Sequence, residues 1–280
     1  MTSEEIQNPQ IYTIGSFEND GWRDLMINRL NHFNFNDPRN HKQSSIARLD
    51  YEDMNAAMNS DIALVYLHSG RRAGTMSYSE LGGARAKGRC IIAVDKNEEK
   101  DSLIKKIASH YYSTEDGVID LIENKKYFSK YPSIKAVDKT KSKDKYKNIL
   151  FAGDLTSMDS LINDMAKIKN IYLGKTLSPL VNFSDKIDLI IVNFDEGRLH
   201  DTYGLFYMGI GYATETPILE LEGNTIPYPP LMGLARRVLI GPKRFDYAKD
   251  YLTHLESQHI DDEALIYYQL MKKYNFTSNI

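Results

Sequence analysis

Glu80 is the first residue to consider for chemistry, because it is the acid in a stretch rich in small side chains, SYSELGGARAKG (77–88). A carboxylate can attack an electrophilic carbon, and the small residues after Glu80 leave space for a ligand beside it. The spacing of Ser77 and Glu80 also matches a capping box, in which each side chain accepts from the other residue's backbone N–H at a helix start. A carboxylate turned back to Ser77 cannot also face a substrate, so the two roles compete.

Alternating apolar and amphipathic segments surround Glu80 in the first half of the chain. The pattern predicts strands over 10–14, 32–36, 61–67 and 90–94, with helices over 22–30, 49–58 and 79–87 between them. This alternation is typical of an α/β fold in which helices cover both faces of a parallel sheet. The helix over 79–87 would place Glu80 in a first turn, where the helix dipole favours the ionised carboxylate.

The second half of the chain repeats this rhythm. Similar segments occur at 148–153, 159–168, 187–194 and 204–221. Three residue pairs give the spacing of the repeat: Ile11 and Ile149 are 138 residues apart, Asp61 and Asp188 are 127 apart, and Ala84 and Ala213 are 129 apart. We therefore expect two flavodoxin-like or Rossmann-like parallel-sheet domains from a diverged tandem duplication. The spacing of 129 places Gly209 at the position of Glu80, which predicts a single chemical site in the first domain.

A lysine-rich stretch separates the two halves. Nine lysines lie between 125 and 147, and we interpret this segment as a solvated linker. The predicted domains are a catalytic domain over 1–124 and a degenerate second domain over 148–280, whose end, 261–274, is expected to be a helix.

Composition limits the classes of function. The formal net charge is only -3, which argues against a broad nucleic-acid-binding surface, and no apolar stretch is long enough to span a bilayer. One cysteine and scattered histidines give no metal-ligand spacing, so we assign no metal. We expect a cytoplasmic protein whose partners are small molecules, with neither nucleic acid nor a membrane among them.

The first 123 residues resemble the nucleoside 2-deoxyribosyltransferase family. The matching pieces are a strand that ends in Gly15, the helix DGWRDLMINRL, the turn NDPRN, an acid-containing helix before SDIALVYL, and Gly74 and Thr75 ahead of SELGGARAKG. The resemblance implies that Glu80 of the ELGxA motif is the nucleophile. It further implies that the second acid is Asp53 or Asp61, and that Tyr12 is the tyrosine of the first strand.

The resemblance also suggests how substrate is bound, without a cofactor. Family members assemble so that neighbouring subunits complete each site, and 226–241 resembles the segment that reaches into an adjoining site. Met232 and Arg236 are candidates for that contact, although a helix on their own domain is an equal alternative. A homo-oligomer is possible.

Loop residues near the predicted site give further binding candidates. Trp22 can stack on a base, although packing at a helix start is the more common role of such a residue. Arg39, Arg71 and Arg72 lie on loops after predicted strands and are candidates to bind a nucleotide phosphate. Exposed loop arginines more often have no specific role, which is the preferred interpretation of Arg72, whereas Arg39 lies in the NDPRN turn that carries the resemblance.

The expected function is transfer of 2-deoxyribose between nucleobases through a covalent ester on Glu80. One alternative is an N-glycosidase that uses water as the acceptor for a deoxynucleoside or its monophosphate. Another is a nucleotide-binding sensor module in which Glu80 is only a helix cap.

Overall fold

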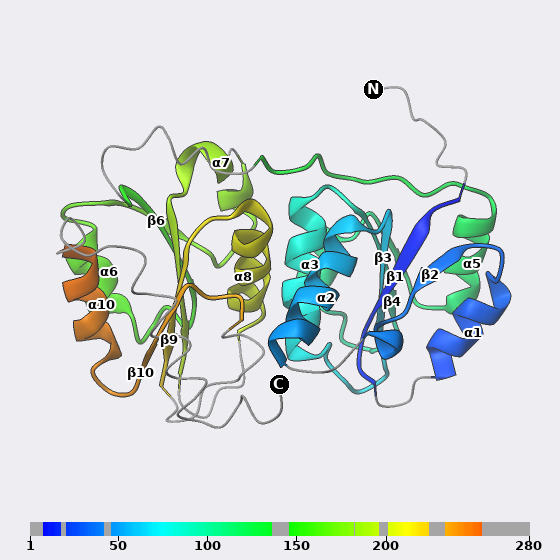
Figure 1. Ribbon diagram of the computed structural model, residues 1–280, viewed down its shortest axis with the longest axis horizontal. Helices are drawn as coiled ribbons and strands as arrows, with labels where there is room; N and C mark the ends of the chain where they lie inside the picture. Colours follow the sequence, from blue (N-terminus) through cyan, green and yellow to red (C-terminus); the bar gives the residue numbers. More distant parts are fainter. Residues whose placement is uncertain are drawn as a thin grey trace.

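The described part of the chain forms two five-stranded sheets that lie side by side, and all the strand pairs within them are parallel (Figure 1). The computed structural model describes residues 8–17, 21–41, 46–135, 146–181, 183–195, 201–223 and 233–253. The predicted helix over 261–274 lies outside these residues.

The first sheet has the strand order β2-β1-β3-β4-β5. Its strands are β1 (Gln10–Ile14), β2 (Asn34–Asn36), β3 (Ile62–Leu67), β4 (Cys90–Asp95) and β5 (His110–Tyr112). β3 and β4 are buried along their whole length, as expected for continuous apolar runs covered on both faces. This order is that of flavodoxin-like proteins, whose chain direction across the sheet reverses between β1 and β3.

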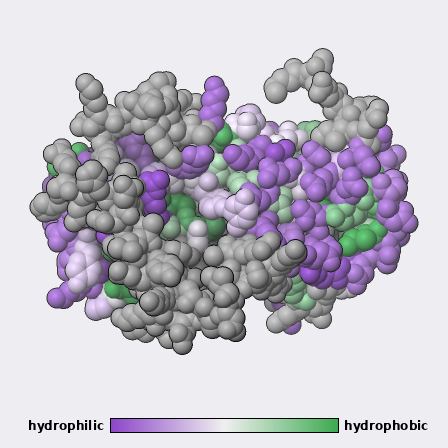
Figure 2. Space-filling model, viewed as in Figure 1, coloured by the Kyte–Doolittle hydropathy of each residue, from purple (hydrophilic) through white to green (hydrophobic). Residues whose placement is uncertain are grey.

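Helices cover both faces of the first sheet. α1 (Gly21–Arg29) and α5 (Glu115–Glu123) pack on one face, whereas α2 (Ile46–Asn59), α3 (Thr75–Ala86) and α4 (Ser102–Ile107) pack on the other. A short 3-10 helix, η1 (Pro38–Asn40), follows β2. The part of this domain visible in Figure 2 is mostly hydrophilic, because its apolar side chains pack inward against the sheet.

The second sheet repeats the same order as β7-β6-β8-β9-β10. Its strands are β6 (Asn148–Gly153), β7 (Asn170–Leu173), β8 (Leu189–Phe194), β9 (Ile218–Glu222) and β10 (Arg237–Ile240). α6 (Asp159–Met165) and α10 (Arg244–Thr253) cover the outer face. α8 (Thr202–Thr214) covers the inner face, with η2 (Ser178–Leu180) and α7 (Phe183–Lys186) nearby.

Strand registers support the tandem duplication. Ile11 pairs with Ile62 in the first sheet, and Ile149 pairs with Leu189 in the second. These pairs keep the spacings of 138 and 127 residues seen in the sequence. Both domains therefore place equivalent residues opposite each other.

The two domains meet where α3 crosses α8, between the sheets (Figure 1). A Cβ atom at Gly82 would lie 2.1 Å from the carbonyl oxygen of Phe206, and one at Gly209 would lie 1.8 Å from that of Ser79. Only glycine permits backbones this close. The Ser79 hydroxyl also donates to the Leu205 carbonyl at 3.0 Å.

This crossing corrects the alignment of the two halves. Gly82 of α3 contacts Phe206 of α8, and Gly209 of α8 contacts Ser79 of α3. These two contacts are equivalent under the repeat only if matching residues are 127 positions apart, which pairs Ser79 with Phe206 and Gly82 with Gly209. The spacing of 129 is therefore wrong for this helix, because it matched two alanines rather than the two glycines of the crossing. Tyr207, not Gly209, stands at the position of Glu80.

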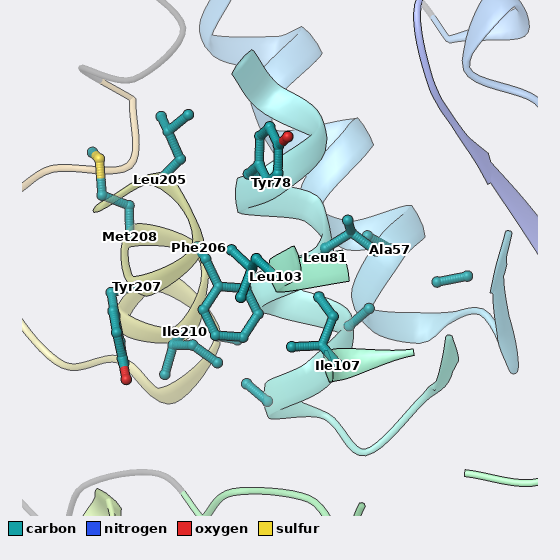
Figure 3. Close-up of a cluster of buried hydrophobic side chains, with 14 of the residues drawn as sticks. Ala57, Tyr78, Leu81, Leu103, Ile107, Leu205, Phe206, Tyr207, Met208 and Ile210 are labelled. Atoms are coloured by element: carbon teal, nitrogen blue, oxygen red, sulfur yellow. The ribbon is translucent and has the colours of Figure 1, made fainter. Parts of the chain in front are cut away.

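One hydrophobic core continues across the crossing. Figure 3 shows Phe206 and Ile210 of α8 facing the first domain, where Leu81 and Ile107 belong to the same buried cluster. Among the described residues, no helix is both long and apolar enough to cross a membrane.

The start of the lysine-rich segment packs on the first domain. Ile134 N–H donates to Ala86 O at 2.6 Å, Arg85 lies over the Tyr131 ring at 4.3 Å, and the Tyr131 hydroxyl donates to Lys106 O at 2.7 Å. Residues 125–135 thus contact the first domain at these points, while eight of the eleven are exposed, as expected for a solvated connector. Tyr131, which lies between the lysines, makes two of these contacts, one with a residue of α3 and one with a residue of α4. Residues 136–145 lie outside the described part.

Candidate active site

A cleft of about 350 Å³ opens beyond the carboxyl ends of β1 and β3, where the first sheet reverses its strand order. Ligands of open α/β sheets bind at such a switch point. Five of the candidate catalytic and substrate-binding residues line it: Tyr12, Gly15, Asp53, Gly74 and Glu80. We refer to it as the Glu80 cleft.

Glu80 is not part of a capping box. α3 begins at Thr75, Gly74 is its N-cap, and Ser77 donates its N–H to Gly74 O at 3.0 Å. Among the described residues, no side chain makes a capping hydrogen bond at the start of this helix. The helix starts four residues earlier than predicted, so Glu80 lies in the second turn, where the influence of the helix dipole is weaker.

The Glu80 carboxylate is 6% exposed and faces Tyr12. The Tyr12 hydroxyl donates to Glu80 Oε1 at 3.2 Å. Tyr12 itself is fully buried, and burial followed by the charges of Glu80 and Asp53 raises its pKa well above the usual value. The Tyr12 hydroxyl therefore keeps its proton at physiological pH and remains a hydrogen-bond donor to the Glu80 carboxylate.

A second carboxyl group, Asp53 of α2, lines the same cleft. Burial raises its pKa, while hydrogen bonds from His41 and Tyr12 oppose that effect. His41 Nδ1 lies 2.6 Å from Asp53 Oδ1, and its Nε2 lies 2.8 Å from Asn36 Oδ1. Asp53 therefore lines the same cleft as Glu80 and has the His41 imidazole as a hydrogen-bond partner.

Arg23 forms part of the cleft wall and was not singled out from the sequence. Its guanidinium donates to Gly15 O at 2.7 Å and Ser16 O at 3.0 Å, and its Nε donates to Thr13 Oγ1 at 3.3 Å. These bonds fix the backbone after β1. The only sequence signal was an arginine beside Trp22 at the start of an otherwise apolar helix face.

The backbone at Gly15 lies close to Tyr66 and Trp22, which leaves little space for a side chain. A Cβ atom there would lie 3.0 Å from the Tyr66 carbonyl oxygen and 3.2 Å from the Trp22 ring. Trp22 does not line the cleft, because it is buried and stacks on Tyr66 with ring centroids 4.7 Å apart. It is a packing residue, and its proposed role in base stacking is corrected.

Asp61 does not lie with Glu80 either. It stands at the amino end of β3, where its Oδ2 accepts from Gln10 N–H at 2.9 Å. Asp188 makes the same bond to Asn148 N–H at 2.9 Å in the second domain. This repeated bond joins two strand starts, so Asp61 is removed from the candidate catalytic group, and Asp53 is left as the second acid.

The remaining candidates lie elsewhere. Arg39 forms ion pairs with Asp37 at 2.6 Å and Asp24 at 2.8 Å, and hydrogen bonds to these carboxylates raise its pKa. Arg236 is exposed just before β10 and is not among the residues of the cleft. Met232 lies outside the described residues. Within the described ranges, no cluster of three or more His, Cys, Asp or Glu residues could hold a metal ion.

Comparisons with known proteins leave the function open. No family model and no curated protein matches the chain. It is similar in structure to a putative sugar binding protein from Salmonella typhimurium LT2, with 11% identity, a TM-score of 0.27, and coverage of 89% of this chain and 87% of that chain. A second similar structure is the C-terminal part of E. coli RcsC, which contains a linker region and a phosphoreceiver domain; identity is 10%, the TM-score is 0.29, and 98% of each chain is covered. The fold assignment rests on the strand order and register.

Proposed function

We propose that the protein transfers 2-deoxyribose between nucleobases through a covalent ester on Glu80. The observation that carries the proposal is the buried Glu80 carboxylate in a cleft at the switch point, held by the Tyr12 hydroxyl at 3.2 Å. The cleft volume is within the range that holds small ligands. The family resemblance of the ELGxA motif gives the substrate class.

Two carboxyl groups of different character suit this reaction. As the bond between C1′ and the base nitrogen breaks, its electron pair goes to the base, and a Glu80 oxygen forms a bond to C1′. Asp53, whose pKa burial raises, supplies the proton that the leaving base needs. A second base then attacks C1′, the ester bond breaks, and the N–H proton of that base returns to Asp53.

The test is incubation with each 2′-deoxynucleoside and each 5′-monophosphate, with and without a free base, followed by chromatography. Transfer predicts a new nucleoside only when free base is present, whereas release of free sugar would favour the hydrolase alternative. Glu80→Gln keeps the shape and the bond from Tyr12 but removes the attacking charge. We expect it to lower activity by about four orders of magnitude, because nucleophile removal has effects of that size.

A matched control is Glu220→Gln, because Glu220 is also a fully buried glutamate but lies on β9 of the second domain. This variant should keep full activity. Equal activity of the Glu80→Gln protein and wild type would refute the proposal. Absence of any reaction in wild type, together with saturable nucleotide binding, would support the sensor module instead.

A further inference from the structure

A second and larger cleft, of about 550 Å³, lies beyond the carboxyl ends of β3 and β4. It is lined by the segment after β3, including Arg71 and Arg72, by the segment after β4, including Lys100, and by Thr202 at the start of α8. We call it the Arg71 cleft. It lies between the two domains, and none of the groups assigned to deoxyribosyl transfer lines it.

The frame of the Arg71 cleft is held by hydrogen bonds between its two segments. Arg71 N–H donates to Asn97 Oδ1 at 3.2 Å, and Asn97 Nδ2 donates to Arg71 O at 3.0 Å. Asn97 N–H and Nδ2 both bond to Asp95 Oδ1, at 2.9 and 3.0 Å. Asp95 is fully buried, so these bonds tie the rim to the sheet.

The charged side chains in the cleft differ in the hydrogen-bond and ion-pair partners that the protein itself gives them. The Asp101 carboxylate accepts from Ile104 N–H at 2.8 Å and from the Tyr78 hydroxyl at 2.6 Å, so both of its oxygens have internal donors. Arg72 is exposed, and the described residues include no ion-pair partner for it. Glu98 and Glu99 are exposed acids on the opposite rim.

A side-chain contact joins the two domains near the start of α8. Lys106 Nζ donates to the Tyr203 hydroxyl at 3.5 Å, which links α4 to α8. The first backbone N–H groups of α8 are not open to a ligand, because Asp201 accepts from Tyr203 N–H and Gly204 N–H at 2.9 and 3.1 Å. The charged side chains that line the cleft all belong to the first domain, and Thr202 is the lining residue from the second.

We propose that the Arg71 cleft binds a phosphate-bearing small molecule through the guanidinium groups of two consecutive lining residues, Arg71 and Arg72. Arginine presents paired N–H donors that match phosphate oxygens, and two neighbouring arginines provide the charge that a phosphate dianion needs. Residues 69–72 line this cleft and residues 74–77 line the Glu80 cleft, so one continuous segment borders both.

The first experiment is isothermal titration calorimetry of the full chain with inorganic phosphate and, separately, with ribose 5-phosphate. We expect one site per chain, with an affinity that falls as salt rises. Replacing both arginines in R71Q/R72Q should weaken binding by about a hundredfold, since each charge-assisted contact accounts for about tenfold. The matched control is R29Q, because Arg29 is half exposed and paired with Asp116 at 3.7 Å on the surface.

A second variant is expected to bind phosphate more tightly than wild type, a result that misfolding cannot produce. Removal of two rim charges in E98Q/E99Q should tighten phosphate binding several-fold. E80Q should bind phosphate as wild type does, whether or not the protein transfers deoxyribose, which separates this proposal from the proposed function. Tighter binding of ribose 5-phosphate than of inorganic phosphate would identify a phosphate monoester as the ligand, whereas equal binding would identify free phosphate. Undetectable binding, or equal binding by R71Q/R72Q and R29Q, would overturn the proposal.

Discussion

The glycine at the helix crossing gives the sharpest test of the structure. A Cβ atom at Gly209 would lie 1.8 Å from the Ser79 carbonyl oxygen, whereas ordinary contact begins at 3.4 Å. Gly209→Ala therefore requires α3 and α8 to move apart by about 1.5 Å, because the contacted atom is backbone and cannot rotate away. Overpacking of this kind costs about 3 kcal/mol, and the better helix propensity of alanine returns only about 1 kcal/mol.

The net effect of Gly209→Ala is thus a loss of about 2 kcal/mol of unfolding free energy, which lowers the urea midpoint by about 1 M. The matched control is Gly211→Ala on the same helix, where the new Cβ meets side-chain atoms of Ile190 and Ile218 at 2.7 and 2.8 Å. These side chains can adjust, so the change should stay within about 1 kcal/mol.

Urea unfolding of both variants can be followed by circular dichroism and by the fluorescence of Trp22, the only tryptophan. Because Ser79 precedes Glu80, displacement of α3 also moves the carboxylate, and deoxyribosyl transfer should fall by about a hundredfold. A Gly209→Ala protein that unfolds at the same urea concentration as the Gly211→Ala protein would refute the close crossing.

Four further substitutions test the two domains. Tyr12→Phe should reduce turnover by about ten- to a hundredfold, measured by single-turnover kinetics, because it removes the donor to Glu80. Ser77→Ala should change stability in urea by less than about 0.5 kcal/mol. Asp101→Ala should cost about 1 kcal/mol, because only Asp101 caps its helix. Burial raises the pKa of Glu222 from 4.5 to about 7. The folded protein therefore holds this proton more tightly, and stability should fall as pH rises from about 4.5 to about 7. Glu222→Gln should flatten that dependence in urea unfolding at pH 5 and pH 8; an unchanged slope would contradict the assignment.

Much of the fold was predictable because long buried strands leave a clear pattern. β3 and β4 coincide closely with the expected 61–67 and 90–94, since fully buried parallel strands read as continuous apolar runs. β5 was not predicted, because a strand of three residues at a sheet edge carries little periodicity. The repeat spacings inferred from the sequence agree with the strand registers of the two sheets. The spacing inferred for α8 was wrong, because the packing of α8 on α3 determines which residues are equivalent there.

The candidate site was only partly predictable, for a similar reason. Tyr12, Gly15 and Glu80 meet because the chain order of a doubly wound sheet brings the ends of β1 and β3 together. Arg23 and His41 act through contacts between distant segments, which no local pattern reports. The capping box was the alternative role for Glu80, and it does not form because α3 begins at Thr75, which places Ser77 inside the helix.

The shared core between α3 and α8 has a consequence for synthesis. The partners of Leu81 are residues such as Phe206 and Ile210, which lie about 125 positions further along the chain. At ribosomal rates of about 5–20 residues per second, the apolar face of α3 waits for roughly 6 to 25 s before its partner helix exists. During that interval the emerging first domain exposes a surface shaped to receive a helix like α8. The nascent chain is therefore most prone to mispairing with a neighbouring copy on the same polysome, and a fused second half shortens that period by placing the correct partner on the same chain.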